Sequence, residues 1–327
     1  MSVRSAFCLA LLLLPLSVPV LAGPAAGPAC FAPAALAARP GEEIVRPRAG
    51  GPVNLPDMAA PSLPPVPAAL RGSIRRVDLP AGQKLVALTF DLCEASGEIS
   101  GYDGAIVDYL RAEGVAATFF AGGKWLMSHA ERGDQLTADP QFEMGNHTWS
   151  HANLTVRTGD AMRRQVDDAD IALALRRSEV QARGCMLPSA SAQGTGGGAL
   201  FRFPYGSCSA ESLNYVNDSG HLAIQWDVDS GDPAFIGAKG MAEDMLRGIR
   251  PGSIVLMHAN GRGKHTAEAL KILIPALRAK GYRFATVGQL LAAGRPVIAD
   301  TCYSLKPGDT RVYDDAARGG KRILPAQ

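Results

Sequence analysis

The chain has 327 residues, of which 47% are hydrophobic and 20% charged, and this size suits one α/β domain of barrel dimensions with appendages. Its 33 Lys and Arg nearly balance its 31 Asp and Glu, which gives a formal net charge of +2 at pH 7. A nucleic-acid-binding protein usually carries a basic patch or a strongly positive net charge. Because this chain is nearly neutral, no nucleic-acid partner is expected. We expect a monomer.

Residues 1–22 predict a signal peptide. Arg4 supplies a positive charge, residues 6–21 form an apolar run with two prolines, and Val20 and Ala22 are spaced like the small residues before a cleavage site. The run is also short for a bilayer span. We therefore expect cleavage after Ala22, a secreted or periplasmic mature protein, and no stable membrane insertion after cleavage.

Cleavage there leaves an odd number of cysteines in an oxidising compartment. Such a set predicts two disulfides and one free thiol. No Cys-x-x-Cys pair is present, which argues against a thiolate zinc site. The remaining cysteines are Cys30, Cys93, Cys185, Cys208 and Cys302.

The chain beyond the leader divides into an irregular part and a regular part. Residues 23–70 are rich in Ala, Pro and Gly without any period, which predicts a mostly irregular N-terminal extension. From Lys84 onward, β-branched and aromatic runs alternate with amphipathic stretches, the pattern of repeated βα units. The predicted strands are 85–91, 116–121, 142–147, 200–205, 222–229, 253–258 and 284–287, and the predicted helices are 102–113, 158–177, 239–249 and 266–280.

Strands joined by helices imply a parallel sheet of the α/β class. About seven of them favour a distorted (β/α) barrel, although an open doubly wound sheet fits the same pattern. The barrel domain would span residues 71–297, and residues 298–327 would form a C-terminal extension.

Polar residues stand at the carboxyl ends of five predicted strands. In a parallel barrel these ends open on one face, where catalytic groups gather. Within this set, His147 and His151 are four residues apart just after a strand, a spacing that lets two imidazoles bind one metal ion. There is no Gly-x-Ser-x-Gly elbow for a serine hydrolase. The five positions are Asp91, His147, Arg202–Tyr205, Asp229 and His258.

Over about Lys84 to Leu291, the chain resembles the polysaccharide deacetylase family, also called the NodB-homology family or carbohydrate esterase family 4. Five of its motifs occur in order, and Ala117-Thr-Phe-Phe120 is similar to a second-strand signature. The first motif, Thr-Phe-Asp-Asp, corresponds to Leu88-Thr-Phe-Asp91, and the second, His-Ser/Thr-x-x-His, to His147-Thr-Trp-Ser-His151. The third, Arg-x-Pro-Tyr, corresponds to Phe201-Arg-Phe-Pro-Tyr-Gly206. The fourth, Asp-x-x-Asp-Trp, corresponds to Asp229-Ser-Gly-Asp232, and the fifth, Leu-x-His, to Val255-Leu-Met-His258.

The resemblance implies a distorted barrel and a metal-dependent hydrolase. A divalent metal, commonly zinc, would bind His147 and His151 and polarise water and the amide carbonyl. Asp91 would be the general base, and Arg202 would position it. The backbone N–H of Tyr205 would bind the oxyanion. His258 would be the general acid, and Asp229 would orient it.

The chain departs from the family at two positions. Pro233 replaces the tryptophan of the fourth motif, and Leu92 replaces the second aspartate of the first motif, which is a metal ligand. Catalytic zinc normally has three protein ligands. A nearby carboxylate, Glu94 in the first place or else Glu98 or Asp103, is the favoured replacement; a site with two histidines and extra waters, or a non-catalytic carbohydrate binder, remains open.

The expected substrate is the N-acetyl group of an N-acetylhexosamine polymer on the cell surface: peptidoglycan, a chitin-like chain or poly-N-acetylglucosamine. Trp149, Tyr205, Pro204 and Phe235 would contact the sugar rings. The alternatives are a glycan-binding protein without activity and an amidase for small C–N substrates. Because Cys93 and Cys208 follow strand motifs on the same face, we expect a disulfide Cys93–Cys208, and we expect Cys30–Cys302 as a clamp between the two extensions.

Overall fold

The computed structural model describes residues 30–49, 53–187, 199–234 and 236–320. The predicted signal peptide and Phe235 lie outside these ranges. No helix in the described part is long and apolar enough to cross a membrane.

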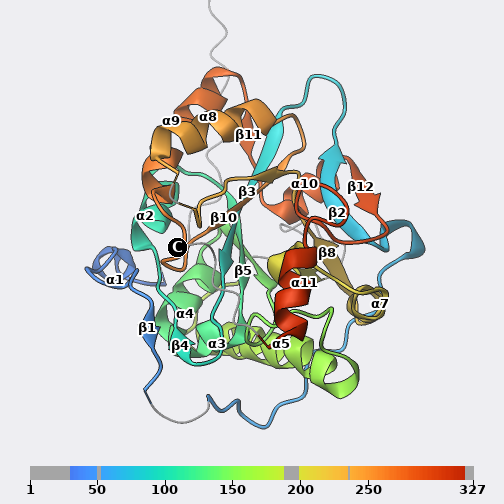
Figure 1. The fold of residues 1–327 in the computed structure, drawn as a ribbon. Helices are drawn as coiled ribbons and strands as arrows, with labels where there is room; N and C mark the ends of the chain where they lie inside the picture. The colour runs from blue at the N-terminus through green and yellow to red at the C-terminus, as the bar shows by residue number, and fades with distance from the viewer. Residues whose placement is uncertain (1–29, 50–52, 188–198, 235, 321–327) are drawn as a thin grey trace, which may run out of the picture.

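The core of the molecule is a ten-stranded sheet (Figure 1). The order along it is β12-β2-β8-β7-β6-β5-β3-β10-β9, with β11 also paired to β3. All neighbours are parallel except β12 and β2, so the predicted parallel α/β barrel is confirmed. The strands are β2 (Ser73–Asp78), β3 (Leu85–Leu92), β5 (Ala117–Ala121), β6 (Phe142–Asn146), β7 (Ala199–Phe201), β8 (His221–Ile224), β9 (Val228–Asp229), β10 (Ile254–His258), β11 (Arg283–Phe284) and β12 (Arg295–Ala299).

Three predicted strands differ in extent. The strand expected over 200–205 ends at Phe201, because Pro204 begins a 3-10 turn, η2 (Pro204–Gly206). The strand expected over 222–229 is two strands, because the segment between β8 and β9 crosses the open side of the sheet: Gln225 N–H donates to Ile74 of β2 at 2.8 Å and Asp227 N–H to Ile254 of β10 at 3.2 Å. The segment thus spans the gap between β2 and β10, which an antiparallel bridge between Arg76 and Ser253 also links. The strand over 284–287 ends at Phe284, since a capping box starts the next helix.

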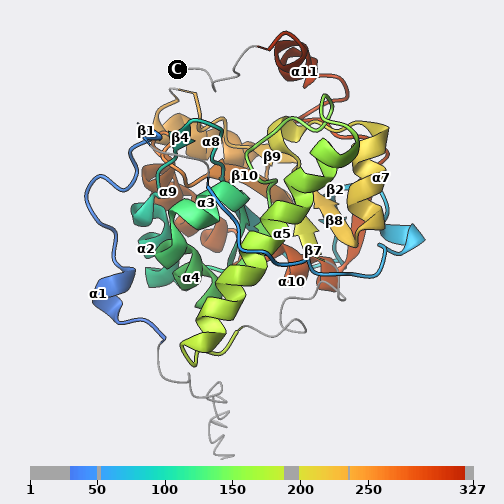
Figure 2. The ribbon, with the colours of Figure 1, turned by 90° about the horizontal axis from the view of Figure 1, so that it is seen from below.

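Helices cover the outside of the sheet. The four predicted helices are present, and α5 runs along one side of the molecule beside α3 and α4 (Figure 2). The helices are α2 (Gly104–Ala112), α3 (Gly123–Ser128), α4 (Ala130–Ala138), α5 (Gly159–Ala182), α7 (Ala210–Asp218), α8 (Ala238–Gly248), α9 (Thr266–Ala279), α10 (Val287–Ala293) and α11 (Arg311–Arg318).

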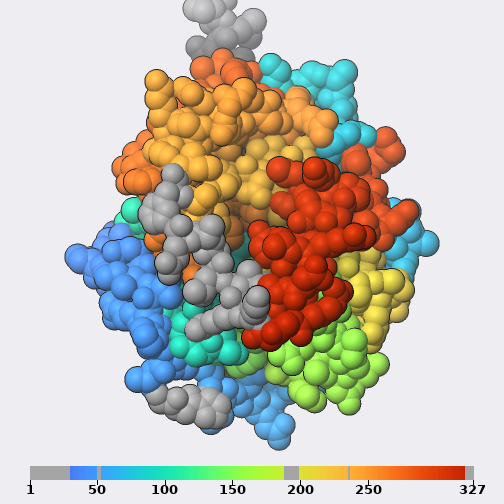
Figure 3. Space-filling model, viewed as in Figure 1, coloured from blue at the N-terminus to red at the C-terminus, as the bar shows by residue number. Residues whose placement is uncertain are grey.

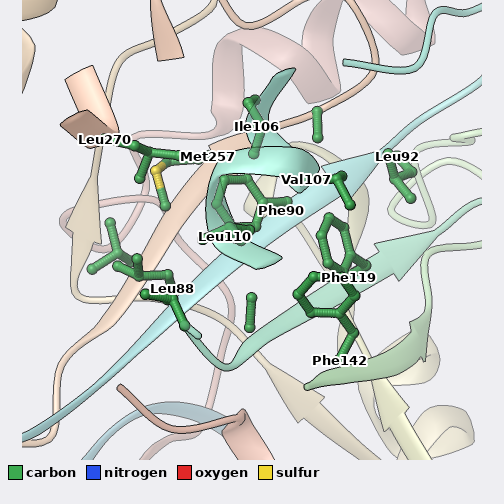
Figure 4. Packing of buried hydrophobic residues seen from close by; sticks show 14 of the residues in the cluster. Leu88, Phe90, Leu92, Ile106, Val107, Leu110, Phe119, Phe142, Met257 and Leu270 are labelled. Atoms are coloured by element: carbon green, nitrogen blue, oxygen red, sulfur yellow. The ribbon is translucent and has the colours of Figure 1, made fainter. Parts of the chain in front are cut away.

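Alternate residues of each strand face the helices or the barrel interior, because the side-chain period of a strand is two. On β3, Leu88, Phe90 and Leu92 pack outward in one cluster with α2 and α9 (Figure 4). Ala87 belongs to a second cluster, which fills the barrel interior with Ile74, Phe120, Leu200, Ile224, Ile254 and Leu256. Residues 87, 89, 91 and 93 therefore share the inward register.

The N-terminal extension is attached to the barrel at several points. It contains a short helix α1 (Pro33–Leu36), a strand β1 (Arg46–Pro47) and a 3-10 turn η1 (Ala68–Leu70). The strand pairs antiparallel with β4 (Glu98–Ile99), in the loop that follows β3. A disulfide between Cys30 and Cys185 joins the extension to the end of α5.

The C-terminal segment folds back over the barrel. After β12, a disulfide between Cys302 and Cys208 fixes it beside η2, and α11 follows. In Figure 3 this segment, in red, lies across the face between the yellow-orange and green parts of the chain. Two disulfides and a free Cys93 agree with the predicted number, but both predicted pairings, Cys93–Cys208 and Cys30–Cys302, are wrong.

The Cys208–Cys302 disulfide should contribute strongly to stability, because it closes a loop of 94 residues in the unfolded chain. Changing both cysteines to serine should lower the free energy of unfolding by about 2–5 kcal/mol. Denaturant unfolding of the oxidised protein measures this loss, with the wild type in parallel. Unchanged stability, together with peptide maps that lack the cross-linked peptide, would contradict the assignment.

Candidate active site

Four predicted site residues meet at the carboxyl ends of neighbouring strands. Asp91 pairs with His258 in the β3–β10 register, and His147 follows β6 as Arg202 follows β7. Each lies in the inward register of its strand, so the four side chains converge at one end of the barrel interior. Gly145, inward on β6, leaves room there, since a Cβ would lie 2.7 Å from the Phe120 ring.

Asp91 is held by a buried ion pair. Its Oδ1 accepts a hydrogen bond from the Arg202 guanidinium at 2.8 Å, and its Oδ2 lies 3.4 Å from Nε2 of His147. Arg202 has no exposed surface; it also donates to the carbonyls of Ile224 and Gln225, and its guanidinium lies 4.1 Å from the Phe120 ring centroid. Because the arginine is fixed on all sides, the carboxylate has one fixed orientation.

His147 presents a bare nitrogen to the site. Its Nδ1 lies 2.9 Å from the Arg202 carbonyl, which can only accept, so Nδ1 carries the proton and Nε2 carries the lone pair. The ring is fully buried, and Nε2 has no hydrogen-bond partner there. Burial lowers the pKa of this imidazole, which keeps it neutral. A buried imidazole with an unpartnered lone pair fits a metal ligand.

His151 lies beside it on a constrained turn. The two ring centroids are 5.0 Å apart, and the ring of Tyr205 packs edge-on against His151 at 4.5 Å. Thr148, His151 and Tyr205 all have positive φ, a conformation that costs of order 1–3 kcal/mol each and that recurs at functional sites. Burial, followed by the nearby His147, lowers the pKa of His151 well below its usual value, so this ring is also neutral and able to bind a metal.

The predicted third ligand, Glu94, is not placed with these histidines. Its buried carboxylate pairs with Arg48 of the N-terminal extension and accepts hydrogen bonds from Ser128 Oγ at 2.8 Å and Ser100 N–H at 3.2 Å. Glu98 pairs with Arg262, and Asp103 caps α2. Each of the three carboxylates is thus used by the surrounding structure.

A cysteine stands where the carboxylate was expected. The sulfur of Cys93 and one ring nitrogen each of His147 and His151 all lie within 4.8 Å of one another. The same sulfur also lies within 4.8 Å of an Asp91 carboxylate oxygen and a His258 nitrogen. Cys93 is free and almost fully buried, and Asn260 Nδ2 donates to its carbonyl at 2.8 Å.

The carboxylate that bonds to the His258 side chain is that of Asp232 and not that of Asp229, the predicted partner. Nδ1 of His258 lies 2.7 Å from Oδ1 of Asp232, while Oδ2 accepts from the His258 backbone N–H and from Thr266 Oγ1, both at 2.8 Å. Asp229 instead accepts from Gly231 N–H and from Ser304 of the C-terminal segment. Both aspartates belong to the fourth motif; the turn at Gly231, with φ of 66°, brings the second one under the imidazole.

Asp91, Cys93, His151 and His258 line a cavity of about 300 Å³, near the lower limit of ligand pockets and large enough for about one sugar unit. Three aromatic residues, Tyr205, Trp226 and Tyr313, are part of its lining. Trp149 lines a neighbouring hollow of about 590 Å³ together with Arg48 and other residues, and Pro204 is buried as the first residue of η2. Phe235 lies outside the described residues.

Sequence reasoning missed several residues of this site. Trp226 could have been found from the strand alternation, because it lies two residues after the inward-facing Ile224. Asp232 could have been found from the Asp-x-x-Asp spacing of the fourth motif. Ser304 and Tyr313 reach the cavity through the C-terminal segment, and Tyr313 stacks on Tyr205 with centroids 5.5 Å apart. No local pattern in that segment indicates this contact.

A barrel whose strand ends carry a fixed carboxylate, a carboxylate-paired imidazole and two neutral histidines has the arrangement of a hydrolase. The sequence profile described as polysaccharide deacetylase matches residues 78–224. Chitooligosaccharide deacetylases of Azorhizobium caulinodans and Rhizobium leguminosarum bv. phaseoli are 29% and 30% identical over 212 and 184 residues, which cover 61% and 53% of this chain and 91% and 73% of those proteins. The chain belongs to the polysaccharide deacetylase family.

Solved structures agree with this assignment. A peptidoglycan N-acetylglucosamine deacetylase is 25% identical with a TM-score of 0.56, over 68% of this chain and 94% of that one. A carbohydrate esterase family 4 pseudoenzyme of Bacillus anthracis is 25% identical with a TM-score of 0.55, over 70% of this chain and 71% of that one. The family thus contains both deacetylases and a pseudoenzyme.

Asp232→Asn should reduce kcat/KM by about 10²–10⁴-fold, the usual range for a lost acid–base function. Burial alone lowers the pKa of His258, but the charge and hydrogen bond of Asp232 outweigh it and raise the pKa to about 9. The imidazolium is therefore present at neutral pH, and activity that needs it should fall as pH rises through about 9.

In Asp232→Asn this descending limb should move to lower pH, as a pH–rate profile would show. Asp229→Asn is the matched comparison, because Asp229 lines the same cavity without bonding to the His258 side chain. Equal losses in the two variants would contradict the assignment of Asp232.

Proposed function

We propose that this protein is a metal-dependent deacetylase that hydrolyses N-acetyl groups of an N-acetylhexosamine-containing cell-surface polysaccharide, such as peptidoglycan, a chitin-like chain or poly-N-acetylglucosamine. The proposal rests on family membership and on one observation: a base and an acid lie side by side without neutralising each other. An oxygen of Asp91 and a nitrogen of His258 are within 4.8 Å, yet Asp91 pairs with Arg202 and His258 with Asp232.

These separate partners allow opposite protonation states at one site. Asp91 accepts a proton from the attacking water while the water oxygen bonds to the carbonyl carbon of the acetamido group. The backbone N–H of Tyr205 donates a hydrogen bond to the developing oxyanion. The imidazolium of His258 then gives its proton to the amide nitrogen as the C–N bond breaks, so acetate and a free amino group form. Asp91 loses its proton to solvent, and His258 regains one.

The residues present fit the metal that the family resemblance implies. His147 and His151 are both neutral, and the unpartnered Nε2 of His147 points to a ligand that the protein itself does not supply. The metal, most commonly zinc in such sites, polarises the carbonyl and activates water when bound. The role of the Asp91–Arg202 pair is to keep a proton acceptor beside the metal site.

A non-catalytic glycan binder has no use for this acid–base pair. Such a protein needs a groove and aromatic surface, whereas here two buried ion pairs, each costly to desolvate, are kept at the end of the barrel. The catalytic proposal accounts for that cost.

Location and domain limits are part of the same proposal. Residues 1–22 would direct export, residues 71–297 would form the catalytic domain, and the segments 23–70 and 298–327 would extend it. The two disulfides support a secreted or periplasmic protein, because such bonds persist in oxidising compartments.

Asp91→Asn should abolish most turnover, with a loss of about 10²–10⁴-fold in kcat, because the base is removed while the side-chain volume stays the same. Metal content, measured by elemental analysis, should stay near that of the wild type. Activity within a few-fold of wild type would exclude the role of Asp91 as base.

The substrate class is tested by acetate release from a panel of acetylated glycans, with small amides and O-acetylated xylan alongside. Release from N-acetylhexosamine polymers is expected, since the cavity accepts about one sugar unit and opens beside the hollow lined by Trp149. Cleavage confined to O-acetyl esters or to small amides would overturn the substrate class. His151→Ala is the negative control.

A further inference from the structure

The position of Leu92 explains why no carboxylate completes the histidine pair. Leu92 has no exposed surface and packs outward against the helix layer, with Val107 and Phe119 (Figure 4). An aspartate at this position would face apolar side chains on the far side of the strand from the two histidines. The next residue, Cys93, lies two positions after Asp91 and therefore faces inward like Asp91.

We propose that the thiolate of Cys93 is the third protein ligand of the metal site, together with His147 and His151. The inference deepens the proposed function, because it concerns the metal on which that function depends. It replaces the expected oxygen ligand with sulfur, so that the site is a Cys-His-His set and not a carboxylate set.

Three independent observations carry the assignment. The three donor atoms lie within 4.8 Å of one another, although they come from the ends of different strands. The Nε2 of His147 is buried and has no hydrogen-bond partner within the described structure. Cys93 is the cysteine that both disulfides leave free, in a chain whose four other described cysteines are paired.

The donor set needs only a small adjustment to hold zinc. In a tetrahedral site with Zn–S near 2.3 Å and Zn–N near 2.1 Å, the sulfur and nitrogen ligand atoms lie about 3.6 Å apart and two nitrogens about 3.4 Å apart. Donor atoms that lie within 4.8 Å of one another reach these separations by moving together by at most about 1.4 Å, which side-chain torsions supply. The backbone of Cys93 stays in place, because Asn260 donates to its carbonyl.

The thiol must lose its proton when the metal binds. Burial, and then the neighbouring Asp91, raise the pKa of Cys93 well above its usual value, so without a cation the group is a neutral thiol. A divalent cation reverses this preference: the S–H bond breaks, the proton leaves to solvent, and the sulfur–metal bond forms. Metal affinity should accordingly rise with pH, and metal loss should leave a stable protonated site.

A second grouping around the same sulfur, with Asp91 and His258, is less favourable for a metal. Asp91 Oδ1 is already bonded to Arg202, and Nδ1 of His258 is bonded to Asp232. An ion there would also lie beside a histidine whose pKa is raised to about 9, so it would have to displace a proton. His147 and His151 are neutral and carry no such penalty.

A sulfur ligand changes which metals the protein selects. Thiolate and imidazole favour zinc and cobalt, whereas a carboxylate in this place would also suit magnesium and manganese. The protein should therefore bind zinc or cobalt and discriminate against magnesium and manganese more strongly than a variant with Asp at position 93.

Cobalt(II) titration of the metal-free, full mature chain tests the ligand directly, without reference to activity. The wild type should develop the near-ultraviolet thiolate-to-cobalt charge-transfer absorption. Cys93→Ser and Cys93→Asp should lack this band, and His147→Ala should not bind cobalt tightly. His265→Asn is the matched control: it is a histidine outside the cluster, with a positive φ that asparagine tolerates, and it should behave as wild type.

Zinc affinity from competition with a chromophoric chelator gives the second readout. Cys93→Ala should weaken zinc binding by at least about 100-fold, and Cys93→Asp should recover most of it, because the aspartate stands in the inward register. A cobalt complex without the sulfur band, or unchanged zinc affinity in Cys93→Ala, would overturn the proposal. A sulfur band in a protein that releases no acetate would leave this ligand standing and refute the proposed deacetylase function alone.

Discussion

The ion pair between Asp91 and Arg202 fixes the geometry on which the rest of the site depends. Both side chains lie inside the barrel, where unpaired charge is very costly, and removal of one partner of such a pair typically costs about 3–5 kcal/mol. The arginine is satisfied on one side by the carbonyls of Ile224 and Gln225, and its own carbonyl sets the tautomer of His147. Arg202 thus contacts the segment between β8 and β9, the Asp91 carboxylate and the His147 ring at once.

Strand alternation decides which side chains can join this arrangement. Inward positions at the carboxyl ends of β3, β6, β7 and β10 supply the polar groups, while the outward neighbours pack against helices. A shift of one residue reverses the direction of a side chain. This explains why Leu92 belongs to the core and Cys93 to the site, although a motif comparison places the ligand at position 92.

The fold and the central residues could be predicted from sequence, because short-range patterns specify them. Apolar strands ending in Asp91, His147 and His258 imply a barrel face, and the structure has these three together. Asp232 was missed because two aspartates three residues apart are equivalent until a turn is known. The disulfide pairs and the place of Tyr313 depend on contacts between segments far apart in the chain, which no local period encodes.

The folding of the C-terminal segment has a consequence under reducing conditions. Ser304 and Tyr313 complete the wall of the cavity, and the disulfide at Cys302 holds them to a loop formed nearly a hundred residues earlier in synthesis. Reduction of this disulfide would release two wall residues of the cavity, whereas Asp91, His147 and His258 are positioned by the barrel strands. The redox state of the surroundings would thus act on the wall of the cavity and not on the polar groups at its base.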